Sequence, residues 1–389
     1  MENRDKATGV ENILIIRLDA IGDMILTSGF IREVRANFPS ARITLVCSPR
    51  VRPVVELCPY INRLLTFDIQ TLDRNIPTMQ ETLADFCKEN FGQEKISIAF
   101  SPQWGSDNLP ALLMARLSDA RERIGYGSYP YAAWLDDPPP QVAALDNFLL
   151  TKNIVTPRNV VSEADKTFYL LEAVGLAVNR RHMELFFGEE DFSRAKDMLR
   201  NVPPTCKKVL LGIGAGGESR KYPADKYLVA LKELVKKNLV FVIVGGKAEL
   251  NDANFIERNM PHGKVLNLVG KTTLRETEAV ISQADFYIGN DSGVMHMAAA
   301  AQVPVLALYR EAQDKEEILP GIFSEFRRFP PLQTQAVILR PDRQLADCER
   351  RGRIYGWCHH AEAHCITKIP PQGIVAAFET LESIVNSKE

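Results

Sequence analysis

The stretch Asn12-Ile-Leu-Ile-Ile16, followed by Arg17-Leu-Asp-Ala-Ile-Gly-Asp23, decides the fold class of this 389-residue chain. The apolar run predicts a buried parallel strand, because a strand covered on both faces shows no polar alternation. The amphipathic stretch 22–37 predicts a helix, and Arg42-Ile-Thr-Leu-Val46 predicts a second strand. Strand, helix and strand in this order form a βαβ unit, so we predict an α/β fold with a parallel sheet.

The same alternation continues along the chain and then restarts. A third strand is expected at 96–100. Later strands are expected at 208–213, 240–244, 286–289 and 303–308, with helices at 190–200, 224–237, 274–283 and 293–301. We therefore predict two Rossmann-like domains, residues 1–180 and 181–370, which face a central cleft. The amphipathic helix within 371–389 is expected either to complete the second sheet or to fold back onto the first domain.

Composition limits the class of protein. Lys and Arg total 47 against 49 Asp and Glu, a formal net charge of −2, so a general nucleic-acid binder is not expected. The first ten residues are polar and charged, which predicts no secretory signal. Apolar runs such as 303–309 are much shorter than the about 20 residues that span a bilayer. Seven cysteines, an odd count, favour reduced thiols. These features predict a cytoplasmic protein, for which any membrane contact would be peripheral.

The loop after the first strand carries two carboxylates. Asp23 stands near the predicted helix N-terminus, where the helix dipole stabilises an ionised carboxylate. Gly22 lets the backbone approach a ligand closely, and Asp19 lies in the same loop. A simple helix-capping role for either aspartate is an equally good explanation of these residues.

The second loop is Gly212-Ile-Gly-Ala-Gly-Gly217, followed by Glu218-Ser-Arg-Lys-Tyr-Pro223. Glycines after a strand expose backbone N–H groups to phosphate oxygens, and Lys221 adds a positive charge. The spacing differs from both the dinucleotide fingerprint and the P-loop, which disfavours an NAD-dependent dehydrogenase. An ordinary glycine turn is the alternative interpretation.

The third loop is Gly289-Asn-Asp-Ser-Gly293, which leads into a predicted helix. Ser292 and Gly293 would begin that helix with unpaired amides, a second anion site beside Asp291, and His296 lies one turn further on. Capping alone is again the alternative.

In this order, the three loops resemble glycosyltransferase family 9, whose best-known members are the ADP-heptose:lipopolysaccharide heptosyltransferases. The resemblance covers most of the chain. Its strongest segments are 13–27, 212–223 with 244–249, and 268–308, and the block 284–300 is the most specific. Arg123-Ile-Gly-Tyr126 also looks like a family segment in the first half.

This resemblance implies a GT-B fold, with the acceptor bound by the first domain and the nucleotide sugar by the second, and inversion at the anomeric carbon. It implies that Asp23 is the general base, and that Lys221 meets the donor's phosphates as the second catalytic residue. Glu249 would hold the ribose, Thr272 would lie beside the base and Asp291 would contact the sugar. The implied donor-binding residues are Gly216, Gly217, Lys221, Glu249, Thr272, Asp291, Ser292, Gly293 and His296.

The donor favoured by the resemblance is ADP-heptose, and another nucleotide sugar stays open. Tyr222 replaces the more usual Trp, and Gly216-Gly217 stand where Thr or Ser is frequent. The chain contains no Asp-x-Asp motif. A lysine and helix-start amides can neutralise a departing diphosphate without a metal, so no cofactor is expected.

The sequence contains two weaker patterns. Asp19 and a set of arginines are candidates for binding an anionic glycolipid or glycan acceptor, although ordinary surface ion pairs explain the arginines equally well. These arginines are Arg50, Arg52, Arg121 and Arg123. A candidate metal site is formed by Cys348, Cys358, His364 and Cys365, but the absence of a Cys-x-x-Cys pair favours reduced thiols instead.

Two further classes stay open at this stage. One is a GT-B-like nucleotide-sugar epimerase or hydrolase, which would act on the donor without an acceptor. The other is a non-catalytic sugar-nucleotide-binding protein, in which Asp23 would be dispensable.

Overall fold

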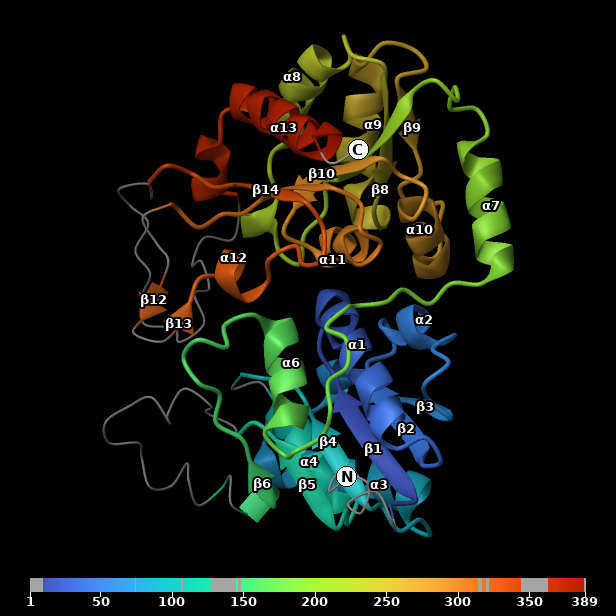
Figure 1. Ribbon diagram of the computed structural model, residues 1–389, viewed down its shortest axis with the longest axis vertical. Helices are drawn as coiled ribbons and strands as arrows, with labels where there is room; N and C mark the ends of the chain where they lie inside the picture. The colour runs from blue at the N-terminus through green and yellow to red at the C-terminus, as the bar shows by residue number, and fades with distance from the viewer. Residues whose placement is uncertain are drawn as a thin grey trace. The chain divides into compact units, whose positions relative to one another are not determined.

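A computed structural model of the protein describes residues 10–73, 75–105, 108–127, 145, 148–313, 317–319, 322–343 and 363–387. The chain divides into two compact units, Met1–Met183 and Glu184–Glu389 (Figure 1). Each unit is built around its own parallel sheet.

The described strands of the first unit form a six-stranded sheet in the order β3-β2-β1-β4-β5-β6, and all of its pairings are parallel. The strands are β1 (Asn12–Arg17), β2 (Arg42–Cys47), β3 (Arg63–Thr66), β4 (Ile98–Ser101), β5 (Glu122–Gly125) and β6 (Lys152–Asn153). The helices are α1 (Ile21–Asn37), α2 (Arg52–Val55), α3 (Ile76–Phe91), α4 (Leu109–Leu117) and α6 (Glu163–Glu172), with a 3₁₀ turn η2 (Ile69–Thr71).

Both faces of the first sheet are covered. Leu14 and Ile16 share a buried core with residues of α3 and α4. On the other face Phe30 of α1 contacts Phe100 of β4 edge to face, with ring centroids 5.6 Å apart, and α6 packs against α1. This double cover explains why β1 is an uninterrupted apolar run.

The second unit repeats this plan in the order β14-β11-β10-β7-β8-β9, again with parallel pairing. Its strands are β7 (Lys207–Gly212), β8 (Leu239–Val244), β9 (Val265–Asn267), β10 (Phe286–Asn290), β11 (Val305–Leu308) and β14 (Ala336–Leu339), with an antiparallel pair β12 (Glu317–Leu319) and β13 (Ile322–Phe323). Its helices are α7 (Glu189–Leu199), α8 (Ala224–Leu234), α9 (Leu250–Asn259), α10 (Leu274–Ile281), α11 (Gly293–Ala300), α12 (Glu325–Arg328) and α13 (Pro371–Asn386). Its 3₁₀ turns are η4 (Glu218–Arg220), η5 (Lys247–Glu249) and η6 (Cys365–Lys368).

The two sheets have the same topology. Counted along each unit, the strand order is 3-2-1-4-5-6 in both, which is the doubly wound Rossmann order. The chain reverses direction across the sheet between β1 and β4 in the first unit, and between β7 and β10 in the second. Ligands of such sheets bind beyond the carboxyl ends of the strands at this switch point. The predicted α/β class with two parallel sheets is confirmed, whereas the cleft between the domains stays a prediction.

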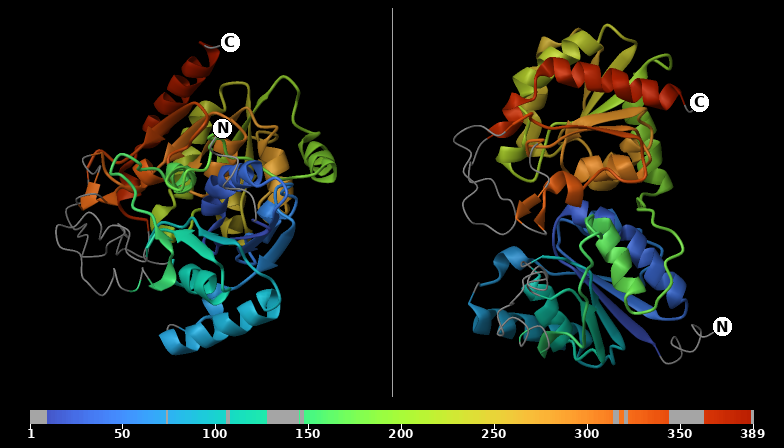
Figure 2. Two further views of the ribbon diagram at one scale, coloured as in Figure 1. Left: turned by 60° about the horizontal axis from the view of Figure 1, so that its bottom comes forward. Right: turned by 60° about the vertical axis from the view of Figure 1, so that its left-hand side comes forward.

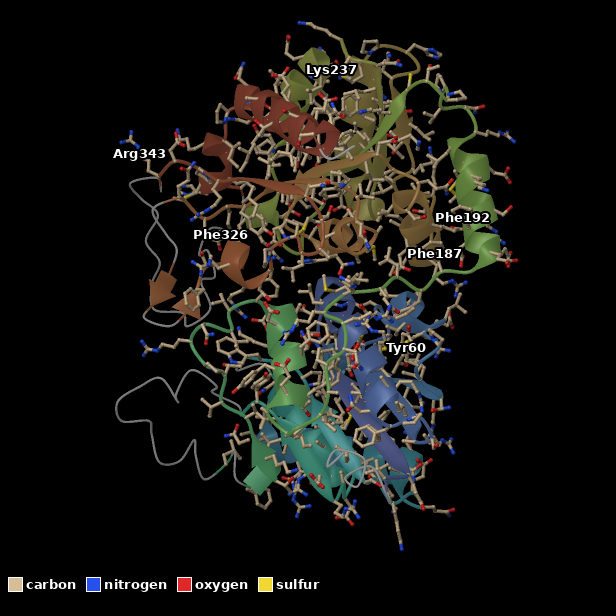
Figure 3. All side chains as sticks on the ribbon, in the orientation of Figure 1. Tyr60, Phe187, Phe192, Lys237, Phe326 and Arg343 are labelled. Carbon is tan, nitrogen blue, oxygen red and sulfur yellow. The ribbon has the colours of Figure 1, made fainter. Side chains whose placement is uncertain are left out.

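The final helix, α13, belongs to the second unit, where it contacts α8, β14 and β11 (Figure 2). Phe378 of α13 packs edge to face on Phe286 of β10 at 5.1 Å. Lys237, labelled in Figure 3, pairs with Glu382 at 2.6 Å. Of the two placements that the sequence left open, α13 takes the one that completes the second unit.

The predicted elements correspond closely to the observed ones, with shifted ends. The strand expected at 303–308 begins at Val305, and the helices expected at 224–237 and 274–283 end at Leu234 and Ile281. Within the described part of the chain, no helix is both long enough and apolar enough to cross a bilayer.

Candidate functional site

A buried arginine organises the acidic loop at the switch point of the first unit. Arg17, the last residue of β1, places Nε 2.8 Å from Asp19 Oδ1 and Nη2 3.2 Å from Asp23 Oδ1. Its Nη1 donates to the carbonyl of Pro102, just after β4, at 3.1 Å. Burial alone would lower the pKa of Arg17, but the charges of Asp19, Asp23 and Glu163 raise that pKa above its ordinary value. The guanidinium therefore stays charged and holds both aspartates at one edge of the sheet.

Neither aspartate is the N-cap residue of α1. The N-cap is Ala20, which makes no side-chain capping hydrogen bond. Asp23 lies in the first turn of α1, and its side chain is 21% exposed while that of Arg17 is 2% exposed. A carboxylate that is anchored on one side and open to solvent on the other can accept a proton from a bound molecule.

A second buried pair lies beside this loop. Lys166 of α6 pairs with Glu163 at 2.8 Å, and its ammonium lies 3.6 Å from the centroid of the Trp104 ring. Trp104 follows β4, so the ends of β1 and β4 and the start of α6 contribute to one polar cluster. Sequence reasoning missed Arg17, Glu163 and Lys166. Arg17 could have been found, because it directly precedes the acidic loop.

The candidate acceptor arginines lie in two different places. Arg50 follows β2 and is exposed, on the edge of the sheet that carries Asp23. Arg52 begins α2 nearby and pairs with Glu56 at 3.2 Å. Arg121 and Arg123 lie at the amino end of β5, which is the opposite edge of a parallel sheet.

The side chain of Arg123 is engaged with its own surroundings. Its Nε donates to the carbonyl of Leu149 at 2.8 Å and its Nη1 to that of Ala120 at 2.9 Å. Burial, followed by the charge of Arg116, lowers the pKa of Arg123. The first unit therefore brings Arg50, and not Arg121 or Arg123, to the edge where Asp23 lies.

In the second unit, the loops after β7 and β8 bring Lys221 and Glu249 together. Lys221 Nζ lies 3.3 Å from Glu249 Oε1 and 2.6 Å from Glu218 Oε1. Burial alone would lower the pKa of Lys221, but these two carboxylates raise it. The other carboxylate oxygen of Glu249 accepts from the backbone N–H of Gly246 at 2.9 Å. The side chain of Lys221 is thus a charged ammonium at the carboxyl edge of the sheet.

The glycines of these loops make room for charged side chains. A Cβ on Gly214 would lie 3.1 Å from the Glu249 carboxyl carbon, and a Cβ on Gly216 would lie 2.3 Å from Arg220 Nη2. Gly217 has open space, with no heavy atom within 4 Å of its added Cβ. Glu249 and Arg220 therefore approach the backbone closely at Gly214 and Gly216, and a side chain at either glycine would have to displace them.

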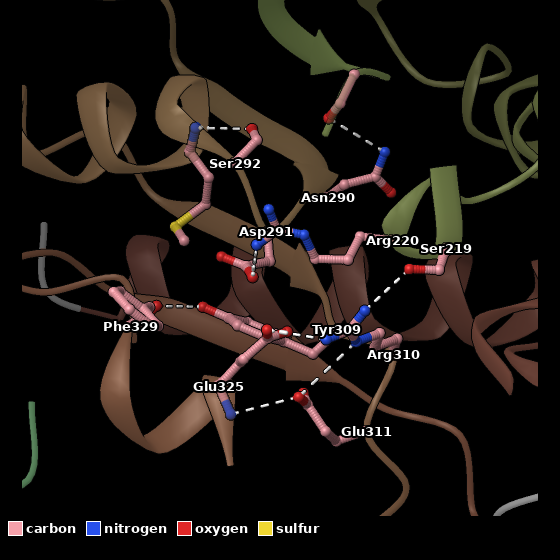
Figure 4. Close-up of polar contacts among 12 residues, drawn as sticks. Ser219, Arg220, Asn290, Asp291, Ser292, Tyr309, Arg310, Glu311, Glu325 and Phe329 are labelled. Atoms are coloured by element: carbon pink, nitrogen blue, oxygen red, sulfur yellow. Dashed lines mark hydrogen bonds and ion pairs between the residues drawn. The ribbon is translucent and has the colours of Figure 1, made fainter. Parts of the chain in front are cut away.

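Arg220 is a site residue that sequence reasoning missed. Its Nη1 lies 3.1 Å from Asp291 Oδ2, so it links the loop after β7 to the loop after β10 (Figure 4). Burial alone would lower the pKa of Arg220, but Asp291 outweighs that effect and raises it. The sequence feature that could have revealed Arg220 is the Arg-Lys pair that follows the glycine loop. Of that pair, Lys221 faces Glu249 and Arg220 faces Asp291.

The loop after β10 is fixed by a buried amide. Asn290 Nδ2 donates to the carbonyl of Ile213 at 2.8 Å, and its Oδ1 accepts from the Tyr222 N–H at 3.1 Å and the Tyr227 hydroxyl at 3.0 Å. Ser292 is the N-cap of α11, and its side chain accepts from the Met295 N–H at 3.5 Å. The capping interpretation therefore holds for Ser292.

Two titratable groups near the start of α11 are perturbed by burial. His296 is buried, and burial followed by the charge of Arg220 lowers its pKa to about 3, so the imidazole is neutral. Its Nδ1 has no hydrogen-bond partner among the described residues. Burial raises the pKa of Asp291 to about 6 against the opposing charge of Arg220. His296 can therefore contribute hydrogen bonds to a ligand but no positive charge.

Thr272 lies in a neighbouring loop. Its Oγ1 is 2.8 Å from that of Thr277. The N–H of Gly270 donates to the carbonyl of Gly245 at 3.0 Å, which keeps this loop beside the one that carries Glu249. The carboxyl edge of the second sheet thus gathers the predicted donor residues from the loops after β7, β8, β9 and β10.

The candidate metal site is only partly described. Cys365 Sγ lies 3.4 Å from Nδ1 of the adjacent His364, while Cys348 and Cys358 lie outside the described residues. Among the residues that the structure does describe, no group of three or more His, Cys, Asp or Glu could hold a metal ion.

The chain is similar in sequence to several known proteins. Residues 146–357 match glycosyltransferase family 9 (heptosyltransferase). The chain is 23% identical to lipooligosaccharide heptosyltransferase 2 of Haemophilus ducreyi, over 84% of this chain and 88% of that protein. It is 24% identical to lipopolysaccharide heptosyltransferase 3 of Escherichia coli K12, over 74% of this chain and 79% of that protein.

Solved structures share the fold. The structure of a family 9 glycosyl transferase from Veillonella parvula superposes with a TM-score of 0.71 at 20% identity, covering 96% of this chain and 97% of that one. E. coli ADP-heptose lps heptosyltransferase II gives a TM-score of 0.67 at 17% identity, covering 97% of this chain and 100% of that one. The predicted GT-B fold class is confirmed.

Proposed function

Because this chain belongs to glycosyltransferase family 9 (heptosyltransferase) and is a glycosyltransferase, we propose that it transfers a heptose from ADP-heptose to a lipopolysaccharide acceptor. The names of its relatives support both substrates. The structural observation that carries the proposal is the set of charged pairs at the switch point of the second unit. There Lys221 faces Glu249 at 3.3 Å and Arg220 faces Asp291 at 3.1 Å.

These pairs suit a nucleoside diphosphate joined to a sugar. Glu249 can accept hydrogen bonds from the ribose hydroxyls, and Asp291 from those of the donor sugar. Lys221 and Arg220 supply positive charge for the phosphates, and the amides at the start of α11, at Gly293, add further donors. Preorganised cations and amides of this kind stabilise the charge that develops on the departing diphosphate. The proposed reaction therefore needs no divalent ion.

The proposed general base is Asp23. As the acceptor hydroxyl attacks the anomeric carbon, its proton passes to the Asp23 carboxylate, and the bond from that carbon to the β-phosphate oxygen breaks. The electron pair of that bond leaves with the nucleoside diphosphate. The acceptor hydroxyl attacks from the face opposite this leaving group, so the anomeric centre is inverted. Arg17 supports this role, because an ion pair with a guanidinium favours the ionised carboxylate that a base requires.

The proposed acceptor surface is the carboxyl edge of the first sheet. Asp19 and Arg50 lie there with Asp23, and Arg50 is suited to the phosphate or carboxylate groups of an anionic glycolipid. Arg121 and Arg123 are not included, because they lie at the opposite edge. We propose that the enzyme meets its lipid-linked acceptor by peripheral contact at the cytoplasmic face of the inner membrane.

A turnover assay tests the reaction. The purified protein is incubated with ADP-heptose and a lipopolysaccharide core that lacks its outer heptose, and both ADP release and the mass of the glycolipid are measured. Asp23→Asn is expected to lower kcat by ~10²–10⁴-fold, the usual contribution of a general base, and to leave ADP affinity unchanged. Asp19→Asn is the matched variant, since both carboxylates pair with Arg17, and it should affect kcat much less.

Other outcomes of this assay would point elsewhere. Full activity in Asp23→Asn would remove Asp23 from the mechanism. Conversion of the donor in the absence of an acceptor would favour an epimerase or hydrolase. Donor binding without any turnover would favour a non-catalytic binding protein.

The phosphate role of Lys221 is tested by calorimetry with ADP. Lys221→Met should weaken ADP binding by about 10- to 100-fold, since hydrogen bonds to charged groups contribute about 1.5–3 kcal/mol. Lys226→Met is the control, because Lys226 binds the carbonyl of Thr367 at 2.6 Å within the same unit. Equal ADP affinities in the two variants would contradict the assignment.

A further inference from the structure

A largely buried ionic cluster contacts the loop that carries Arg220 and Lys221. It consists of Arg310 and Glu311, which follow β11, and Glu325, the first residue of α12 (Figure 4). Arg310 Nη2 lies 2.9 Å from Glu325 Oε1. Its Nη1 donates to the hydroxyl of Ser219, the central residue of η4, at 2.9 Å. The cluster therefore connects the loop after β11 to the loop after β7, although β10 separates these two strands in the sheet.

The charges of this cluster are balanced around Arg310. The side chain of Glu311 is completely buried, with Oε1 4.0 Å from Arg310 Nε, and burial raises the pKa of Glu311 to about 8. Burial alone would also raise the pKa of Glu325, but Arg310 and Arg220 lower it. At neutral pH Glu311 is therefore protonated, while Glu325 is ionised and holds Arg310.

Such a cluster is poorly explained by stability alone. Among the described residues, Oε2 of Glu311 and Oε2 of Glu325 are buried without a hydrogen-bond partner. Buried ion pairs of this kind are often no more stabilising than apolar residues of similar volume. Neither the fold nor the proposed chemistry uses Arg310, Glu311 or Glu325 directly.

The loop that Arg310 contacts has little support of its own. It contains one 3₁₀ turn, held by hydrogen bonds from Arg220 N–H to the Gly217 carbonyl and from Lys221 N–H to the Glu218 carbonyl, both at 3.0 Å. Gly217 has no packing neighbour within 4 Å of its added Cβ. Anchors from outside the loop must therefore fix the direction of its two cationic side chains.

We propose that Arg310 is a positioning residue for the donor site, which holds η4 through Ser219 and so aims Arg220 and Lys221 at the diphosphate. Glu325 holds Arg310 in this orientation. The donor part of this inference rests on the proposed function, whereas the anchoring of the loop does not. Removal of the anchor should loosen segment 213–221 and weaken donor binding, without affecting the acceptor.

Hydrogen exchange tests the anchoring in the absence of ligand. In the full-length protein, Arg310→Met and Ser219→Ala should both increase amide exchange in segment 213–221, and the double variant should resemble Arg310→Met, because the two side chains act through one contact. Arg275→Met is the control, since it breaks a guanidinium–carboxylate pair with Asp191 (3.2 Å) elsewhere in the same unit. Unchanged exchange of this segment in both Ser219→Ala and Arg310→Met would overturn the proposal.

Calorimetry with ADP and steady-state kinetics test the link to the donor. Arg310→Met should raise the ADP Kd and the donor KM by about 10-fold, which corresponds to about 1.4 kcal/mol of binding free energy. It should also lower kcat, because the same cations stabilise the departing diphosphate, with the acceptor KM nearly unchanged. An equal rise in the donor KM and the acceptor KM would show that Arg310 has a merely structural role, and it would overturn the proposal. If the wild-type protein does not bind ADP, the proposed function fails, while the exchange measurement still decides whether Arg310 anchors the loop.

Discussion

The replacement Glu278→Gln should stabilise the second unit, increasingly so as the pH rises. Glu278 lies on α10 with a fully buried side chain, and its Oε2 accepts from the Phe186 N–H at 3.2 Å. Among the described residues its Oε1 has no hydrogen-bond partner. Burial raises the pKa of Glu278 from 4.5 to about 8. The folded protein therefore keeps a proton that the unfolded chain releases above pH 4.5.

The magnitude follows from this difference in pKa. Stability decreases with pH wherever the folded state binds more protons than the unfolded state, here between pH 4.5 and about 8. One pKa unit corresponds to about 1.4 kcal/mol, so Glu278 costs the folded state about 3 kcal/mol at pH 7 relative to pH 4.5. Glutamine keeps the carbonyl that Phe186 requires and cannot ionise. The stability of the variant relative to wild type should rise by about this amount over that range.

Glu276, two residues away on the same helix, provides the opposite control. Burial alone would raise its pKa, but hydrogen bonds from Thr273 and Arg194 lower it. Its contribution to stability is therefore present above the unfolded pKa and is lost as the pH falls through the folded pKa. Glu276→Gln should therefore lose stability relative to wild type only between the folded pKa and pH 4.5, and its difference from wild type should stay nearly constant above about pH 5.

Urea unfolding at pH 5, 6, 7 and 8, followed by tryptophan fluorescence and circular dichroism, measures both differences. If the difference between Glu278→Gln and wild type does not change with pH, Glu278 is not protonated in the folded protein. A pH-dependent difference for Glu276→Gln as large as that for Glu278→Gln would contradict the reasoning as well.

Three further predictions concern other parts of the molecule. Gly216→Ala should raise the donor KM by about 10-fold with little change in melting temperature, because the new Cβ would lie 2.3 Å from Arg220 Nη2 and would displace this binding group. Kinetics and a thermal melt compare the two effects. An unchanged KM would contradict the prediction. Iodoacetamide at pH 8 should label Cys206 before Cys47, since burial raises the pKa of the Cys47 thiol to about 12 whereas Cys206 is partly exposed. Peptide mass mapping gives the order of labelling, and the reverse order would refute the prediction. Phe378→Ala should lower the free energy of unfolding by about 3–5 kcal/mol, because the contact with Phe286 is lost. Denaturant unfolding measures this change, and a change below about 1 kcal/mol would show that α13 is not part of the core.

The central strands were predictable from sequence because burial on both faces forces an apolar run. β1, β7, β8 and β10 all have this character. The edge strands were not predicted, for a related reason. β3 begins with the charged Arg63 and is only partly buried, and β6 is the exposed pair Lys152–Asn153. A short strand at an edge keeps its register through its neighbour and not through its own hydrophobic pattern.

The candidate site was predictable in its loops but not in its contacts. The glycine loop and the Asp-Ser-Gly loop follow strands, so their location could be inferred from the order of elements. Which of Arg220 and Lys221 faces which carboxylate depends on the turn η4, which places adjacent side chains in different directions. The pairing of Arg310 with Glu325 joins a strand end to a separate helix, and no local pattern in the sequence reports such a contact.

The position of α13 has a consequence for synthesis on the ribosome. Residues 180–182 already complete the first unit, where Arg32 binds the carbonyls of Arg180 and His182. The second unit, in contrast, buries Ile374, Phe378 and Leu381 in its core. During synthesis the first unit can therefore fold before the second. Phe286 of the second unit stays uncovered until α13 has been synthesised. During that interval the exposed apolar surface of the unfinished half favours association with other chains.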